Sequence, residues 1–268
     1  MGAARRRGVQ IGPLTRCRHA IADRLVLSKV RDLFGPDLQL VLTGAAPISK
    51  TVLEFFDACG VTVLEGYGLS ETTAAGTLNT PSSCRFGTVG RALPDVELSI
   101  AADGEILMRG PNVFRGYFKD DEATREVLDD GWLHSGDLAT MNENDYCKIT
   151  GRSKDLIIRG GENIYPRDIE EFLYTHPAIS EVQVIGIPDR KYGEQVMAWV
   201  KLKPGVTASS EELREYCEGK IAYFKIPKYF KFTDSFPMTV TGKIQKFKMR
   251  EMSTKELGLE QAASIRTA

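Results

Sequence analysis

The sequence predicts an α/β layer, then antiparallel β structure, and then a small α+β domain. Three observations lead to this fold class. Up to residue 66 helical and strand patterns alternate, over 86–152 short strands are separated by turns, and beyond residue 152 helices and strands mix again. A chain of 268 residues with 42% hydrophobic content is long enough for two domains. We place them at residues 1–152 and 153–268.

The first elements form a strand-helix-strand unit. Apolar residues recur at largely helical spacing over 20–34, and Gly-Pro-Asp follows directly. A strand is expected over 38–44, a capped helix over 49–60 and a second strand over 61–66. This order predicts a parallel α/β layer, in which ligands bind at the carboxyl ends of the strands.

Short strands follow, over 87–94, 96–110 and 131–152, and their turn-rich spacing predicts an antiparallel, barrel-like sheet. Beyond it the order is strand, helix, two strands, helix, strand, which predicts a compact α+β domain. These last elements are expected over 155–161, 166–177, 181–188, 195–203, 210–220 and 228–234.

Composition excludes several classes of protein. A formal net charge of -1 provides no field that would gather nucleic acid or an anionic membrane. The sequence has no apolar run near the ~20 residues of a membrane helix, and residues 1–20 lack the apolar core of a signal peptide. Five scattered cysteines and three distant histidines predict reduced thiols in a cytoplasmic protein, without a Cys or His metal cluster.

The stretch LEGYGLSETT at 64–73 ends a predicted strand with glycines and oxygen-bearing side chains. Gly66 and Gly68 allow the backbone to bend or to approach a ligand, and Ser70 and Glu71 supply oxygen atoms. This composition suits a phosphate or a hard metal ion. An ordinary strand running into a polar loop is the alternative interpretation.

Two further strand ends carry small or acidic residues. In VLTGAAPIS at 41–49, Gly44 and Ala45 would admit a flat ring against the backbone, although a tight strand-to-helix connection explains them equally well. In HSGDLA at 134–139, Asp137 follows a glycine and could accept hydrogen bonds from a ribose, whereas a turn-forming aspartate is the alternative.

Two stretches of the C-terminal part combine glycine with cations. GRSKDLIIRGGENI at 151–164 has the charges and the Gly160-Gly161 pair that a hinge could use, and a charged β-hairpin is the alternative. Lys243 follows a glycine in a threonine-rich turn within 236–250. A solvated lysine without a role is the alternative there.

Together, in this order and spacing, these stretches resemble the AMP-forming acyl-CoA ligases of the adenylate-forming superfamily. The resemblance runs over about residues 21–250. GYGLSETT looks like the nucleotide and metal motif, HSGD like the ribose aspartate, GRSKD like the ribose arginine and hinge, and TGKI like the catalytic lysine. It implies a partial large AMP-binding domain with a β-barrel remnant, followed by a mobile α+β C-terminal domain.

The resemblance implies that AMP or ATP binds to the turns at the strand ends. Tyr67 would stack on adenine, Ser70 would touch the α-phosphate, and Asp137 would bind the ribose hydroxyls. Arg152 would bind the ribose or a phosphate. The whole implied nucleotide set is Gly44, Ala45, Gly66, Tyr67, Gly68, Leu69, Ser70, Asp137 and Arg152.

The same resemblance implies the catalytic, metal and coenzyme A residues. Glu71 would hold Mg²⁺, and Lys243 would neutralise charge as a carboxylate attacks the α-phosphate. Lys154 would be the hinge about which the C-terminal domain swings before the thiol of coenzyme A attacks. Three residues would line the pantetheine path: Gly160, Gly161 and Glu162.

Family members also carry, upstream, a Ser/Thr/Gly-rich loop that ends in lysine and holds the β- and γ-phosphates, and residues 1–36 contain no such loop. The leading hypothesis is an acyl-CoA ligase, or its C-terminal half, that acts on a fatty or similar carboxylic acid. As a half-enzyme it would need a complementary N-terminal half on another chain. The alternatives are an AMP-binding module without catalysis and an adenylation domain that loads a carrier protein.

Overall fold

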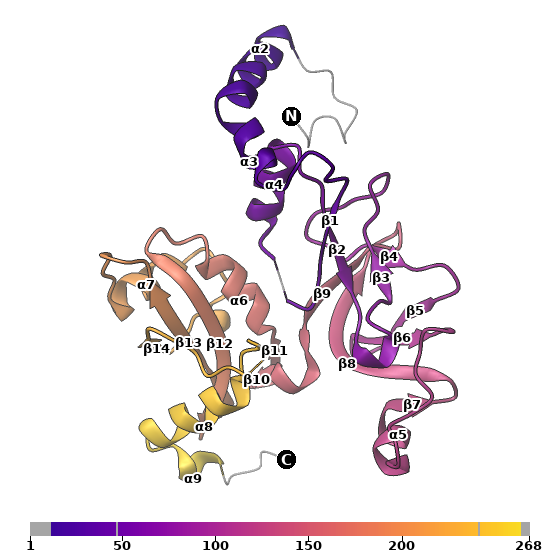
Figure 1. The fold of residues 1–268 in the computed structure, drawn as a ribbon. Coiled ribbons are helices and arrows are strands. Elements are labelled where there is room, and N and C mark those ends of the chain that lie inside the picture. Colours follow the sequence, from indigo (N-terminus) through magenta and orange to yellow (C-terminus); the bar gives the residue numbers. More distant parts are fainter. Residues whose placement is uncertain (1–11, 47, 241, 264–268) are drawn as a thin grey trace. The chain divides into compact units, whose positions relative to one another are not determined.

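The computed structural model describes residues 12–46, 48–240 and 242–263 (Figure 1). The chain divides into two compact units, Met1–Ile149 and Thr150–Ala268. The division falls within strand β9 (Cys147–Arg152), the strand whose last residue is the predicted end of the first domain. We describe each unit by itself.

The first described elements of unit 1 are three consecutive helical segments, α2 (Pro13–Ala22), a π-helical turn (Asp23–Leu27) and α3 (Ser28–Asp32). The helix therefore starts earlier than residue 20, because Pro13 takes the first helical position, where its missing N–H costs nothing. The Arg31 guanidinium bonds the Asp23 carboxylate and the carbonyl oxygen of Cys59, both through Nη1, at 2.7 and 2.6 Å. These contacts tie the helical segments to the end of α4 (Lys50–Ala58).

The first sheet has the order β1-β2-β3-β4. Strands β1 (Val41–Thr43) and β2 (Val63–Tyr67) pair in parallel, and α4 connects them, which confirms the predicted strand-helix-strand unit. The Ser49 side chain caps α4 by accepting from the N–H of Val52. The short strands β3 (Thr77–Leu78) and β4 (Arg91–Ala92) extend the sheet antiparallel.

The second sheet of unit 1 is antiparallel, in the order β5-β6-β8-β7 with β9 paired to β8. The antiparallel prediction is confirmed, but the barrel-like prediction is wrong, because none of the sheets in the described residues closes on itself. Sequence periodicity shows that strands alternate but not whether the first and last strands meet. The strand bounds are β5 (Glu97–Ile100), β6 (Glu105–Arg109), β7 (Leu128–Asp129) and β8 (Trp132–Met141). A short helix that the sequence analysis missed, α5 (Asp121–Val127), precedes β7.

Unit 2 is the predicted α+β domain. Its sheet has the order β11-β10-β13-β12, and β14 pairs in parallel with β13. The strands are β10 (Ile157–Arg159), β11 (Glu162–Ile164), β12 (Ile179–Asp189), β13 (Gly193–Leu202) and β14 (Tyr229–Phe232). The helices are α6 (Pro166–Leu173), α7 (Ser210–Cys217), α8 (Lys246–Glu256) and α9 (Glu260–Ala263), of which the sequence analysis missed the last two.

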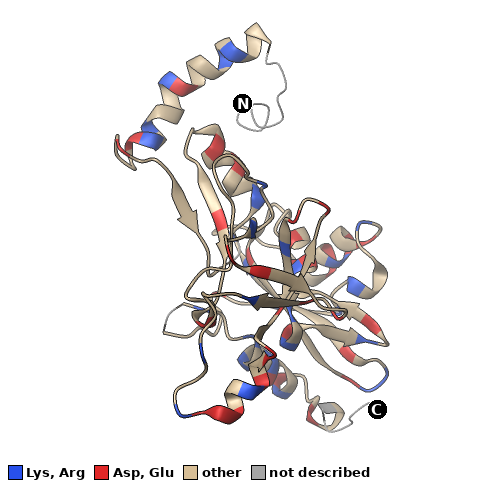
Figure 2. Cartoon of the chain, turned by 90° about the vertical axis from the view of Figure 1, so that its right-hand side faces the viewer, with Lys and Arg blue, Asp and Glu red and all other residues tan. Residues whose placement is uncertain are grey.

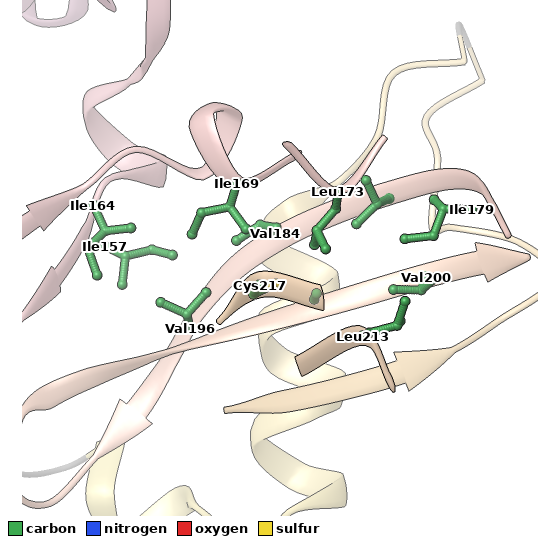
Figure 3. Close-up of a cluster of buried hydrophobic side chains, with 12 residues drawn as sticks. Ile157, Ile164, Ile169, Leu173, Ile179, Val184, Val196, Val200, Leu213 and Cys217 are labelled. Carbon is green, nitrogen blue, oxygen red and sulfur yellow. The ribbon is translucent and has the colours of Figure 1, made fainter. Parts of the chain in front are cut away.

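Alternation along β13 divides the core of unit 2 between the two faces of its sheet. Val196, Ala198 and Val200 pack with residues of α6 and α7 in one cluster (Figure 3), whereas Met197 and Trp199 pack with Met249 of α8 on the other face. The indole Nε1–H of Trp199 donates to Ser253 Oγ of α8 at 2.9 Å, so these two buried polar groups are paired. Helices therefore cover both faces.

Basic and acidic residues are interspersed over the elements in the view of Figure 2. This distribution agrees with the near-zero net charge of the sequence. Among the described residues no helix is both long and apolar enough to cross a membrane.

Candidate functional site

Two of the predicted nucleotide-binding residues meet in unit 1. Tyr67 ends β2 and Asp137 lies in β8, and the tyrosine hydroxyl donates to Asp137 Oδ2 at 2.7 Å. Asp137 is 6% exposed, and its backbone N–H donates to Ser135 Oγ at 3.1 Å. Burial, followed by the charge and the hydrogen bond of Asp137, raises the pKa of Tyr67. The phenol therefore stays protonated at neutral pH and acts as a donor to the carboxylate.

Asp137 lies within β8 and not at the strand boundary that the sequence predicted, and Glu105 of β6 holds the residues before it, where the β6–β8 register is irregular. The two oxygens of this carboxylate bond His134 Nδ1 at 2.8 Å and the N–H of Gly136 at 2.7 Å. Glu105 thus fixes both ends of His134-Ser135-Gly136, directly before Asp137. Glu105 is not among the site residues predicted from the sequence. Its signal is an acidic residue that opens the otherwise apolar run Ile106–Met108, which is unusual for a strand that faces a core.

Gly44 and Gly66 lie close together where β1 and β2 end. The strand register pairs Thr43 with Glu65, and a Cβ on Gly44 would lie 3.2 Å from the carbonyl oxygen of Gly66. A Cβ on Gly66 would meet Leu78 Cδ1 of β3 at 2.9 Å. Packing of neighbouring strands thus accounts for both glycines, and any ligand contact there would involve the main chain. Ala45 has a left-handed φ of 62°, which turns the chain sharply after β1.

After Gly68 the chain closes into a tight turn. A Cβ on Gly68 would lie 2.4 Å from the carbonyl oxygen of Ala74, so only glycine fits. The carbonyl oxygen of Leu69 accepts from the N–H of Thr72 and of Ala74, at 3.1 and 2.9 Å. Ser70 is exposed on the one-turn 3₁₀ helix that follows (Ser70–Thr72).

Glu71, in the middle of this 3₁₀ helix, is the predicted metal ligand. Its Oε1 accepts from the hydroxyl of Tyr117 at 2.7 Å, and this bond, together with burial, raises the pKa of Tyr117. The described residues contain no group of three or more His, Cys, Asp or Glu side chains placed to hold a metal. Mg²⁺ commonly binds through one or two carboxylates together with water and substrate phosphate, so Glu71 alone fits a cation shared with a nucleotide.

The other predicted site residues belong to unit 2. Arg152 ends β9, and Lys154 lies on the 3₁₀ turn Ser153–Asp155; both side chains are exposed. Gly160 and Gly161 form the two-residue turn of the β10–β11 hairpin, with φ of 59° and 88°. Positive φ at both central positions is the reason for a glycine pair in such a turn.

The hairpin turn is fixed on one side. The N–H of Gly160 donates to the carbonyl oxygen of Tyr192 at 2.8 Å, and a Cβ on Gly160 would lie 3.1 Å from that tyrosine ring. A Cβ on Gly161 would meet nothing within 4 Å. Glu162 is exposed beside it, opposite Arg159 in the hairpin register. The backbone here forms the charged β-hairpin that the sequence allowed as one of two interpretations. The coenzyme A role of these residues stays a prediction.

Lys243 lies at the end of an exposed turn. Its N–H donates to Thr239 Oγ1 at 3.0 Å, and its carbonyl oxygen accepts from the N–H of Thr239 at 2.8 Å. Gly242, with a φ of 80°, allows the chain to return just before the lysine. The turn fixes the backbone of Lys243 and leaves its side chain exposed.

The chain matches two known family models and is similar to known proteins. Residues 16–118 match the family model described as AMP-binding enzyme, and residues 168–243 match the one described as AMP-binding enzyme C-terminal domain. Among curated proteins, "Putative acyl-CoA synthetase YngI" of Bacillus subtilis (strain 168) is 47% identical over 250 residues, covering 85% of this chain and 45% of that protein. The medium-chain acyl-CoA ligase ACSF2, mitochondrial, of Danio rerio is 44% identical over 209 residues, covering 72% of this chain and 34% of that protein.

A solved structure of a CoA synthetase is also similar to this chain. The o-succinylbenzoate CoA synthetase of Bacillus subtilis, in complex with its acyl-adenylate intermediate, superposes with a TM-score of 0.75 at 31% identity. The match covers 84% of this chain and 49% of that one. The chain therefore spans about half the length, or less, of the relatives that it matches.

Proposed function

Because the chain belongs to the adenylate-forming superfamily, we propose that it acts in the AMP-forming ligation of a carboxylic acid to coenzyme A. Relatives named acyl-CoA synthetase or ligase support this activity class. The observation that carries the proposal is the hydrogen bond from Tyr67 to Asp137, two residues of different motifs and different sheets. The bond joins the two stretches that resemble the family's nucleotide motif and ribose aspartate, and it holds a buried carboxylate that would accept the ribose hydroxyls.

We assign the nucleotide contacts of unit 1 to the carboxyl ends of β1 and β2, the turn that follows β2, and Asp137 within β8. The aromatic ring of Tyr67 would stack on adenine while its hydroxyl holds Asp137. Asp137 would accept the ribose hydroxyls, and Ser70 would meet the α-phosphate. Glu71 would bind Mg²⁺, which would neutralise phosphate charge when bound.

In the first half-reaction the substrate carboxylate would attack the α-phosphorus of ATP, forming an acyl-phosphate bond and releasing pyrophosphate. Two anions approach each other in this step, so a cation that acts in the transition state lowers the barrier. We assign Lys243 to that role. In the second half-reaction the thiol of coenzyme A would attack the acyl carbon, and AMP would leave.

The acid and the compartment also belong to the proposal. A relative named medium-chain acyl-CoA ligase favours a fatty acid, and the names of the relatives favour coenzyme A over a carrier protein as the acceptor. The cytoplasmic location inferred from the cysteines stays a prediction, since a matching ligase of Homo sapiens is named mitochondrial.

Pyrophosphate exchange on the purified chain, with a panel of carboxylic acids that includes medium-chain fatty acids, tests the first half-reaction. Conversion of preformed acyl-AMP and coenzyme A to the thioester tests the second. We expect thioester formation from acyl-AMP, and exchange either alone or after addition of a complementary N-terminal half. AMP binding without either reaction would replace the ligase by an AMP-binding module, which the short coverage of the relatives makes the second candidate.

We further propose that the segment from Arg152 to Lys154 is a hinge. Proline at position 154 would fix φ and hinder rotation there. Lys154→Pro should therefore slow the thioester step much more than adenylation, whereas Lys154→Ala, the matched control, should leave both rates near the parent values. Single-turnover measurement of the two steps checks this, and equal slowing of both would refute the hinge.

A further inference from the structure

The backbone around Glu71 cannot by itself hold the carboxylate in one orientation. Glu71 lies in a single 3₁₀ turn, and such short turns have weak hydrogen bonds. The residues that follow, Thr73 and Ala74, have left-handed φ of 53° and 73° although both carry a Cβ. This conformation is unfavourable for them and requires support from the surroundings.

That support comes from residues 112–117, which we call the clamp segment. Asn112 Nδ2 donates to the carbonyl oxygen of Ala75 at 2.7 Å, and Thr73 Oγ1 donates to the carbonyl oxygen of Asn112 at 2.8 Å. The N–H of Phe114 donates to the carbonyl oxygen of Glu71 at 2.7 Å. Two of these hydrogen bonds fasten the clamp segment to the backbone on both sides of the strained residues, and the third joins it to the side chain of Thr73.

The last residue of the clamp segment reaches the carboxylate itself. The hydroxyl of Tyr117 donates to Glu71 Oε1 at 2.7 Å. Tyr117 is anchored in turn, because its N–H donates to Thr124 Oγ1 of α5 at 2.9 Å and its ring packs edge-on against Phe114, with centroids 4.9 Å apart. A tyrosine held at its backbone and ring presents its hydroxyl in a fixed direction.

We propose that Tyr117 is a positioning residue for divalent-cation binding: its hydroxyl engages Oε1 of Glu71 and thereby orients Oε2 toward a cation shared with the nucleotide. This inference rests on the proposed function. Groups that bond a metal-binding carboxylate through its second oxygen typically contribute about 10-fold to 100-fold to metal affinity. Tyr117 lies 46 residues beyond Glu71 and belongs to none of the motif stretches of the sequence.

The test measures Mn²⁺ binding to the full chain saturated with AMP, by the electron paramagnetic resonance signal of free Mn²⁺. Tyr117→Phe removes only the hydroxyl and should weaken Mn²⁺ binding by about 10-fold, with AMP affinity in chelator unchanged. Tyr146→Phe is the matched control, since it also removes a hydroxyl that is hydrogen-bonded in unit 1, to Ser83 Oγ at 2.5 Å. It should bind Mn²⁺ as the parent does.

A double-mutant cycle separates positioning from general damage. In a Glu71→Gln background, Tyr117→Phe should cause no further loss of Mn²⁺ affinity. Parent-like Mn²⁺ binding by Tyr117→Phe, or an equal loss in the Gln background, would overturn the inference. A parent that binds AMP but no Mn²⁺ would also overturn it and leave the nucleotide assignment standing, whereas a parent that does not bind AMP would overturn the proposed function.

Discussion

The two units differ in how their hydrophobic residues are used. In unit 2 a cluster of twelve buried residues joins α6 and α7 to one face of the sheet. In unit 1 the buried clusters are small, and the helical segments over Pro13–Asp32 contain no buried residue. Large side chains are exposed there, among them Leu25 at 60% and Leu33 at 84%.

Hydrogen bonds hold the candidate site of unit 1. The bonds of Tyr67 to Asp137, Glu105 to His134 and Tyr117 to Glu71 join residues that are far apart in sequence. We therefore expect substitutions in the core of unit 2 to act mainly on stability, and substitutions at the turns of unit 1 to act mainly on ligand binding.

The largest effect is expected from the core of unit 2. Leu213 is 0% exposed, and Leu213→Ala should lower the free energy of unfolding by about 2–5 kcal/mol because it removes apolar contacts and leaves a cavity. Leu25→Ala in unit 1, where the side chain is 60% exposed, should change it by less than about 0.5 kcal/mol. Urea denaturation followed by circular dichroism checks both. Equal losses would show that the contrast between the units does not govern stability.

The next effect concerns Lys243 of unit 2, to which we assign a role in adenylation but none in nucleotide binding. If the proposed role is right, Lys243→Ala should slow adenylation by about 10²-fold or more, because it removes the cation that we assign to that transition state. Thioester formation from supplied acyl-AMP, and AMP affinity, should stay at the parent values. Single-turnover assays on both half-reactions, with exposed Lys248→Ala as the control, check this. Equal loss in both half-reactions would remove Lys243 from the adenylation step.

The next prediction concerns AMP binding by Asp137 of unit 1. Asp137→Ala should weaken AMP binding by about 1.5–3 kcal/mol, because a charged hydrogen-bond acceptor is lost. Glu143→Gln, at an exposed position of unit 1, should leave the affinity unchanged. Calorimetry measures both. AMP binding of Asp137→Ala as tight as that of the parent would refute the ribose assignment.

The smallest effect is a pH dependence in unit 2. Burial lowers the pKa of His176 below its usual 6.5, and neutral Nδ1 accepts from the N–H of Ala178 at 3.2 Å. The unfolded chain therefore binds a proton that the folded chain does not, so stability should fall as pH drops below about 6.5 toward the folded pKa. His176→Asn, which keeps an acceptor, should remove this part of the slope in urea denaturation at several pH values. An unchanged slope would exclude His176 as its source.

The order of the elements could be predicted because periodicity and turn residues are local properties of the chain. The parallel pairing of β1 with β2, the alternation along β13 and the helix α7 with its Ser209 cap all follow from patterns within a few residues. The missed helix α8 has exposed Lys, Phe and Met residues, and its two buried residues are Met249 and the polar Ser253, so its apolar pattern is weak. The motif residues, including Tyr67, Asp137 and Lys243, were found from local stretches in the same way.

Local patterns in the chain thus predict the class of each region, the motif stretches and the family that they resemble. Which side chains meet follows only from the folded arrangement. That β5 to β9 form an open sheet depends on whether distant strands bond, and the positions of Glu105 and Tyr117 depend on contacts across 29 and 46 residues of chain. Neither leaves a periodic signal, because a hydrogen bond between two distant side chains is specified by the fold of the backbone between them and not by the residues beside either one.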